Sequence, residues 1–195
     1  MSKPDVPISV MEAIYQRSSV RSYAPQKLDE ATIRTLLDAA VRAPTAIHEE
    51  PWQFAIIQDM SALKRISDRA KSFFREEVNR AHLDRGGHGL DHFASPEFNI
   101  FYNAGTLIII CGSQTTPFVT ADCWLAAENL ILAAYSMGLG SCVIGSAVAG
   151  INTPELKAEL GIPPESSAIA PIIVGVASGE TAPTPRRRAK ILAWK

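Results

Sequence analysis

Apolar residues recur every three to four positions along several stretches of the chain, which is the spacing of one face of an α-helix. The clearest stretch follows Asp29, a residue type suited to capping a helix N-terminus, and Pro44 is expected to end it. Its apolar face consists of Ile33, Leu36, Leu37, Ala40 and Val41. Similar patterns and caps predict further helices over residues 9–16, 61–80, 119–137 and 153–160.

Three short runs rich in β-branched or aromatic residues predict strands, at residues 52–57, 106–111 and 168–176. The second run is apolar throughout, which is typical of a strand buried on both faces. The third contains Pro171, whose missing N–H favours an early or irregular position in the strand. Residues 141–146 follow a glycine-rich helix stop and are predicted to be short and extended.

The length and composition indicate one domain spanning residues 1–195, and the composition bears on the partners of the protein. Apolar residues make up 47% of the chain and the mean hydropathy is +0.06, which suggests an extra buried surface such as a subunit interface. The net charge of −1 disfavours a nucleic-acid or membrane partner. Because no apolar run is long enough to span a bilayer, no signal-peptide pattern is found and the three cysteines stand singly, we expect a cytoplasmic protein with reduced thiols.

A short basic segment lies near the N-terminus, Arg17-Ser18-Ser19-Val20-Arg21. Guanidinium groups match phosphate oxygens with parallel hydrogen bonds, and serine hydroxyls add further donors. The segment could therefore hold a phosphate group, or it could be a solvated loop, as most short basic stretches are. A second basic cluster lies near the C-terminus, with Arg186, Arg187, Arg188, Lys190 and Lys195.

Several familiar sites are missing from the sequence. The chain has no phosphate-binding P-loop and no Gly-x-Ser-x-Gly nucleophile motif. Gly138-Leu139-Gly140 follows a helix and lacks the third glycine of a dinucleotide-binding fingerprint.

Three histidines, His82, His88 and His92, fall within eleven residues and raise the question of a metal site. His88 and His92 would share one face of a helix, but the glycines at positions 86, 87 and 89 oppose a helix there. We therefore expect residues 81–98 to form a polar lid or loop, without a metal.

Four stretches, taken in order, resemble the motifs of the FMN-dependent nitroreductase family. The segment 17–21 is similar to that family's Arg-Arg/His-Ser-x-Arg/Lys motif, and residues 43–52 are similar to its Ala-Pro-Ser-x-x-Asn-x-Gln-Pro-Trp loop. Residues 138–145 are similar to its Gly-Leu-Gly-Thr-x-x-Ile-Gly segment, and residues 185–188 to its Pro-Arg-Arg tail. The resemblance covers about residues 9–195.

The resemblance implies an α+β fold in which helices wrap a mainly antiparallel central sheet. It also implies a homodimer with two FMN sites at the subunit interface and a C-terminal arm that reaches the partner subunit. The implied activity is a ping-pong transfer of electrons from NADH or NADPH, through FMN, to nitroaromatics, quinones or similar small acceptors. Flavin N5 would carry the chemistry, so no catalytic protein residue is expected.

The family's cofactor-binding roles fall on matching positions of this chain. Residues 17–19 would hold the phosphate together with the arginines at 186–188, and Arg21 would reach the pyrimidine edge of the flavin. Residues 44–46 would line the ring or ribityl chain, and residues 144–146 would face the ring near N5. The expected cofactor contacts are Arg17, Ser18, Ser19, Arg21, Pro44, Thr45, Ala46, His48, Ile144, Gly145, Ser146, Arg186, Arg187 and Arg188.

Two positions depart from the family pattern. His48 stands where the family usually has Asn, and Glu50 where it usually has Gln. A histidine offers hydrogen bonds of different reach, and a carboxylate close to the ring would disfavour a reduced, anionic flavin. The flavin potential and the acceptor could therefore differ from those of typical members. A specialised relative that dehalogenates aromatics or consumes flavin, and a flavin-binding protein with little turnover, stay open as alternatives.

Overall fold

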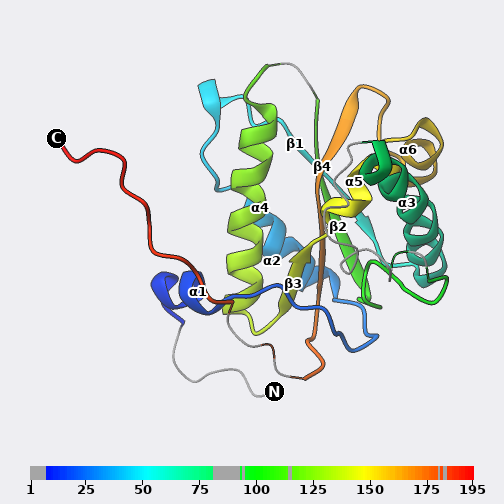
Figure 1. Cartoon of the computed structure of the whole chain (residues 1–195), viewed down its shortest axis with the longest axis horizontal. Helices are drawn as coiled ribbons and strands as arrows, with labels where there is room; N and C mark the ends of the chain where they lie inside the picture. Colours follow the sequence, from blue (N-terminus) through cyan, green and yellow to red (C-terminus); the bar gives the residue numbers. More distant parts are fainter. Residues whose placement is uncertain (1–7, 81–92, 94, 114–115, 180, 182–183) are drawn as a thin grey trace.

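The computed structural model describes residues 8–80, 93, 95–113, 116–179, 181 and 184–195 (Figure 1). Within these ranges the α-helices are α1 (Val10–Gln16), α2 (Glu30–Ala40), α3 (Met60–Arg80), α4 (Val119–Ser136), α5 (Val148–Ile151) and α6 (Pro154–Leu160). Two 3₁₀ turns are η1 (Ala46–His48) and η3 (Gly145–Ala147). The strands are β1 (Trp52–Ile57), β2 (Thr106–Ser113), β3 (Gly140–Val143) and β4 (Ser166–Gly175).

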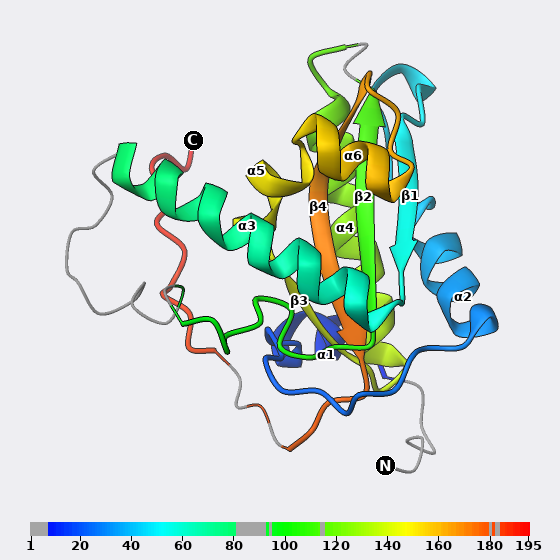
Figure 2. The ribbon, with the colours of Figure 1, turned by 90° about the vertical axis from the view of Figure 1, so that its right-hand side faces the viewer.

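The four strands form one sheet in the order β1-β2-β4-β3, and every neighbouring pair is antiparallel. The two central strands, β2 and β4, are buried almost throughout, as the apolar runs predicted. Helices pack on both faces of the sheet (Figure 2). The expected α+β fold with an antiparallel sheet wrapped by helices is therefore confirmed.

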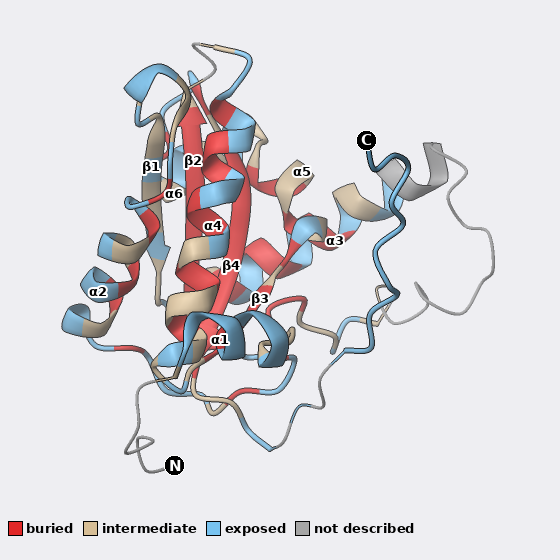
Figure 3. Ribbon diagram, turned by 90° about the vertical axis from the view of Figure 1, so that its left-hand side faces the viewer, coloured by how far each residue is buried: buried red, intermediate tan, exposed pale blue. Residues whose placement is uncertain are grey.

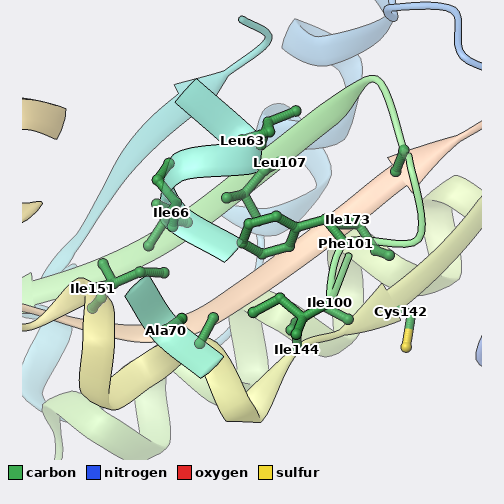
Figure 4. Packing of buried hydrophobic residues seen from close by; sticks show 14 of the residues in the cluster. Leu63, Ile66, Ala70, Ile100, Phe101, Leu107, Cys142, Ile144, Ile151 and Ile173 are labelled. Atoms are coloured by element: carbon green, nitrogen blue, oxygen red, sulfur yellow. The ribbon is translucent and has the colours of Figure 1, made fainter. Parts of the chain in front are cut away.

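Side chains alternate between the two faces of β2 and so feed two separate cores. Ile108 and Ile110 pack with α2 and α4 on one side of the sheet. Leu107 and Ile109 pack on the other side with α3, α5 and α6, where Phe101 is fully buried (Figure 4). The helices α4 and α3 thus cover opposite faces of the same sheet.

Two local expectations were wrong, and a third was right in one of its alternatives. Helix α2 ends at Ala40 rather than reaching Pro44, because the chain turns through hydrogen bonds to the carbonyls of residues 39 and 40. Residues 145 and 146 are not extended but enter the turn η3. Pro171 was expected at an early or irregular position. It lies in the middle of β4, next to a register shift at residues 168–170, and its carbonyl accepts the Ile144 N–H at 2.8 Å. In a strand, the N–H and C=O of one residue point toward the same neighbouring strand, which for Pro171 is β3. Because β3 ends at Val143, opposite Ile172, no β3 residue needs an N–H donor from position 171.

Large apolar side chains remain exposed on α1, α4 and the C-terminal segment. Helix α4 buries one face against the sheet but leaves Trp124 and Leu125 more than two-fifths exposed, and α1 lies against α4. The C-terminal segment 184–195 is exposed along its whole length (Figure 3). None of the described helices combines the length and apolar character needed to cross a membrane.

Candidate functional site

The basic segment forms a loop that is hydrogen-bonded to the sheet. Ser9 caps α1, and Arg17 ends it by donating its backbone N–H to the carbonyl of residue 13 at 3.0 Å. The loop then runs beside β3, where the Val20 N–H donates to the Ser141 carbonyl at 3.0 Å. Backbone hydrogen bonds from Ala24 and to Ser22 tie its far end to the chain that follows β4. The 17–23 loop therefore has a fixed backbone rather than a solvated one.

Close packing holds this loop against β3. A Cβ added at Gly140 would lie 2.9 Å from three carbon atoms of Val20, so only glycine allows the loop to approach so closely. The Tyr23 hydroxyl donates to the Val20 carbonyl at 2.9 Å across the turn between them. Burial raises the pKa of Tyr23 far above its ordinary value, so its hydroxyl stays protonated and remains a donor.

The loop concentrates positive charge at the first residues of β3. Among the described residues, neither Arg17 nor Arg21 forms an ion pair with a carboxylate. Burial raises the pKa of the Cys142 thiol, while the positive charge of Arg21, a hydrogen bond with the Ser19 side chain and the charge of Arg17 oppose that rise. Both arginines belong to the loop that runs beside β3, and within the described residues no carboxylate pairs with either, so their charges are available to an anion.

The segment after β3 offers an open backbone surface. The chain leaves the sheet at Ile144 and turns through η3 into α5. A Cβ added at Gly145 would meet no atom within 4 Å, so space is free in front of this residue. The Asn152 side chain pairs with both the N–H and the C=O of Ala168 in β4, at 2.8 and 2.9 Å, and so fixes the end of α5. A flat ligand could lie against residues 144–146 without a side chain of Gly145 in its way.

The loop that resembles the family's proline-rich motif is strained. Ile47 and His48 have φ angles of 50° and 57°, and Glu50 has a φ of 46°. The left-handed region costs an L-residue about 1–2 kcal/mol, and a β-branched residue such as Ile47 rarely adopts it. Strain of this kind persists only where the surroundings impose it, and it is common at ligand-binding sites.

Two side chains near the start of α4 hold that loop. The Asp122 carboxylate accepts the Ala46 N–H, with distances of 3.2 and 3.3 Å to its two oxygens. The Thr116 hydroxyl donates to the Glu49 carboxylate at 2.8 Å. Asp122 is only 3% exposed. We did not single out Asp122 from the sequence; its one signal was a carboxylate at the start of a strongly apolar helix.

The structure brings some of the expected site residues together and leaves others apart. Residues 17–21 lie beside β3, and residues 144–146 directly follow that strand. The 44–48 loop instead lies at the opposite end of α4, about 20 Å away by the rise of the helix from Asp122 to Ser136. Arg186, Arg187 and Arg188 are exposed, and within the described residues no hydrogen bond or ion pair joins them to the 17–23 loop.

The three histidines of the expected lid, His82, His88 and His92, lie outside the described residues. Elsewhere in the described chain, no group of three His, Cys, Asp or Glu side chains is arranged to hold a metal ion. The three cysteines are buried free thiols, and burial raises the pKa of each.

Comparison with known proteins identifies relatives that share both the sequence pattern and the fold. The chain is 28% identical over 158 residues to a protein assigned as an NADH dehydrogenase/NAD(P)H nitroreductase from Archaeoglobus fulgidus, covering 78% of this chain and 76% of that one. It is 28% identical over 130 residues to an iodotyrosine deiodinase from Thermotoga neapolitana, covering 65% and 68%. A crystal structure of a nitroreductase with bound FMN from Bacteroides fragilis superimposes with a TM-score of 0.79 at 26% identity, covering 94% and 97%.

A protein-family model also matches most of the chain. The model of the nitroreductase family matches residues 14–176, a range that contains the 17–23 loop, the 44–48 loop and the turn after β3. The chain therefore belongs to the nitroreductase family.

Proposed function

We propose that the chain is an FMN-dependent oxidoreductase that takes electrons from NADH or NADPH and passes them to a small acceptor such as a nitroaromatic or a quinone. One observation carries the proposal: the loop that holds Arg17 and Arg21 is hydrogen-bonded to β3, and the open surface at Gly145 directly follows that strand. Among the described residues, neither arginine has an acidic partner. Relatives with this fold include a nitroreductase with bound FMN.

The residues present fit the parts of FMN. A phosphate carries nearly two negative charges at neutral pH, and Arg17 with the hydroxyls of Ser18 and Ser19 can donate charge-assisted hydrogen bonds to it. The ring would lie against residues 144–146, where the missing Cβ of Gly145 leaves room. The first N–H groups of η3 have no acceptor inside that turn and can donate to a ring atom. When bound, FMN would supply the chemistry by taking up a hydride from NAD(P)H and passing it to the acceptor.

We further propose that the site is completed by a second copy of the chain. The 44–48 loop and the 17–23 loop lie at opposite ends of α4, so one chain cannot bring them together. In a twofold pair with antiparallel α4 helices, the first turn of one helix would meet the last turn of the other. The 44–48 loop of each subunit would then lie near the basic loop of its partner.

The exposed apolar side chains support such a dimer. Among the described residues, ten of the fourteen large exposed apolar side chains occur on α1, at α4 and on the C-terminal arm: Val10, Met11, Ile14, Tyr15, Phe118, Trp124, Leu125, Ile191, Leu192 and Trp194. Large exposed apolar residues grouped over neighbouring elements are typical of subunit interfaces. In this dimer the arm would carry Arg186–Arg188 across to the partner's phosphate site.

The purified protein tests the proposed function directly. After reconstitution, heat or acid should release a yellow chromophore that behaves as FMN, and recovery of FAD or of no flavin would contradict the proposal. Anaerobic NADH or NADPH should bleach the bound flavin, and a quinone or nitroaromatic should restore its colour. Bound flavin that neither nicotinamide bleaches would instead indicate a flavin-binding protein with little turnover.

A second candidate is a member of the family with a narrow substrate. The match to an iodotyrosine deiodinase and the replacement of the family's Asn and Gln by His48 and Glu50 favour it. Reduced protein mixed with iodotyrosine separates the two candidates. Release of iodide faster than the reduction of quinones would favour the dehalogenating activity, and release of none would leave the oxidoreductase.

A further inference from the structure

A buried carboxylate lies where the strained loop meets α4. Asp122 is 3% exposed, and both of its oxygens lie within 3.3 Å of one donor, the Ala46 N–H. We propose that Asp122 is the positioning residue of the 44–48 loop, holding it in the conformation in which it contacts the flavin. This inference rests on the proposed function, because only a flavin-binding protein needs the loop in that conformation.

The position of the hydrogen bond explains why it matters for the loop. Ala46 is the last residue before Ile47 and His48, which both have positive φ angles. A backbone fixed at Ala46 prevents these two residues from relaxing into the ordinary regions of φ and ψ. Without the carboxylate, the Ala46 N–H would lose its acceptor and the strained turn would lose its fixed start.

The backbone of Asp122 is held by its own helix. The residue lies in the first turn of α4. The Asp122 N–H itself donates to the Phe118 carbonyl at 2.9 Å, so the backbone of this residue is fixed before the side chain reaches the loop. A second tie, from Thr116 to Glu49, holds the loop two residues after Ile47.

The hydrogen bond needs an acceptor oxygen, but it does not need a full charge. An asparagine at position 122 keeps one carbonyl oxygen in the same place and can accept the Ala46 N–H. Asp122→Asn should therefore preserve the position of the loop, whereas Asp122→Ala should release it. A residue that served only to fill space or stabilise α4 would not produce this difference in flavin binding.

Helix α4 supplies a matched control. Asn129 lies two turns after Asp122, and its Nδ2 donates to the Ala39 carbonyl at the end of α2 at 3.2 Å. It thus makes the same kind of contact, from a side chain of α4 to the backbone of a neighbouring element, but it does not touch the 44–48 loop. Asn129→Ala reports what the loss of such a contact does to stability alone.

The test has one readout with the flavin and one without it. In the first, FMN and riboflavin are titrated against the wild type and the variants Asp122→Ala, Asp122→Asn and Asn129→Ala. Asp122→Ala should lower the affinity for FMN and for riboflavin equally, by about tenfold, because the loop lines the ring and not the phosphate. Asp122→Asn and Asn129→Ala should stay within about threefold of the wild type. Unchanged flavin binding in Asp122→Ala, or an equal loss in Asn129→Ala, would overturn the inference.

The second readout follows amide exchange at Ala46 in the flavin-free protein. The Ala46 N–H should be protected in the wild type and in Asp122→Asn, and should exchange at least about ten times faster in Asp122→Ala. Equal exchange in all three proteins would refute the positioning role even if flavin binds. A wild type that binds no flavin but shows the expected exchange pattern would refute the proposed function, while supporting Asp122 as the residue that fixes the loop.

Discussion

Replacing Gly140 by alanine should displace the basic loop. The new methyl group would lie 2.9 Å from the Cβ, Cγ1 and Cγ2 atoms of Val20, whereas carbon atoms pack best at about 3.5–4.0 Å. A change of rotamer cannot move the Cβ of Val20, so the backbone of the loop must shift by about 0.6–1 Å. Overpacking of this kind typically destabilises a protein by about 1–3 kcal/mol.

The same shift of the loop should weaken the binding of FMN. A hydrogen bond of about 2.9 Å that lengthens by 0.6–1 Å falls outside the usual range. Loss of one charge-assisted hydrogen bond to the phosphate is worth about 1.5–3 kcal/mol, or about tenfold to a hundredfold in affinity. Denaturant unfolding of the flavin-free protein and fluorescence titration with FMN measure the two effects separately.

Gly138→Ala is the matched control for this prediction. Gly138 has a φ of 75°, so alanine there is strained, but its Cβ would meet no atom within 4 Å. We expect a loss of stability of about 1–2 kcal/mol without any movement of the 17–23 loop. Equal FMN affinity in the two variants would show that contact between Val20 and Gly140 does not control the cofactor site.

Two further predictions concern the thiols and the dimer. Burial, with smaller contributions from Cys111 and Asp122, raises the pKa of the Cys123 thiol from 9.0 to about 12. Above pH 9 the unfolded chain therefore loses this proton before the folded chain does. The free energy of unfolding should fall between pH 9 and pH 12 by about 1.4 kcal/mol per pH unit for this thiol. Unfolding midpoints measured against pH should fall less steeply in Cys123→Ala, and an unchanged slope would contradict the assignment. Light scattering at micromolar concentration should give the mass of a dimer for the wild type and a smaller mass after Trp124→Asp, since this change places a charge on the exposed apolar side of α4; a monomeric wild type would refute the interface site.

Local patterns predicted the elements and the family, because both depend on residues that are near in sequence. Asp29 caps α2 and Thr153 caps α6, with side-chain hydrogen bonds to the N–H groups three residues later. The resemblance of residues 17–21 and 43–52 to family motifs led to the nitroreductase family, which the family match confirms. The roles of the individual site residues stay predictions.

Contacts between distant segments could not be predicted from one sequence. Gly140 was expected to stop a helix and to belong to a family motif, yet the structure shows that it also makes room for Val20, which lies 120 positions earlier. Asp122 belongs to an apolar helix and acts on a loop 76 positions earlier. The middle position of Pro171 depends on where β3 leaves the sheet, which is a property of the neighbouring strand.

If Arg17 holds the phosphate of FMN, the protein should distinguish FMN from riboflavin, which lacks that phosphate. Both ligands are titrated against the wild type, Arg17→Ala and the control Arg34→Ala, which removes an exposed arginine that is paired with Glu30 on α2. We predict that Arg17→Ala weakens FMN by about 2 kcal/mol, or about thirtyfold, and leaves riboflavin nearly unchanged, while Arg34→Ala affects neither. Equal losses for FMN and riboflavin in Arg17→Ala, or no loss for FMN, would contradict the phosphate site.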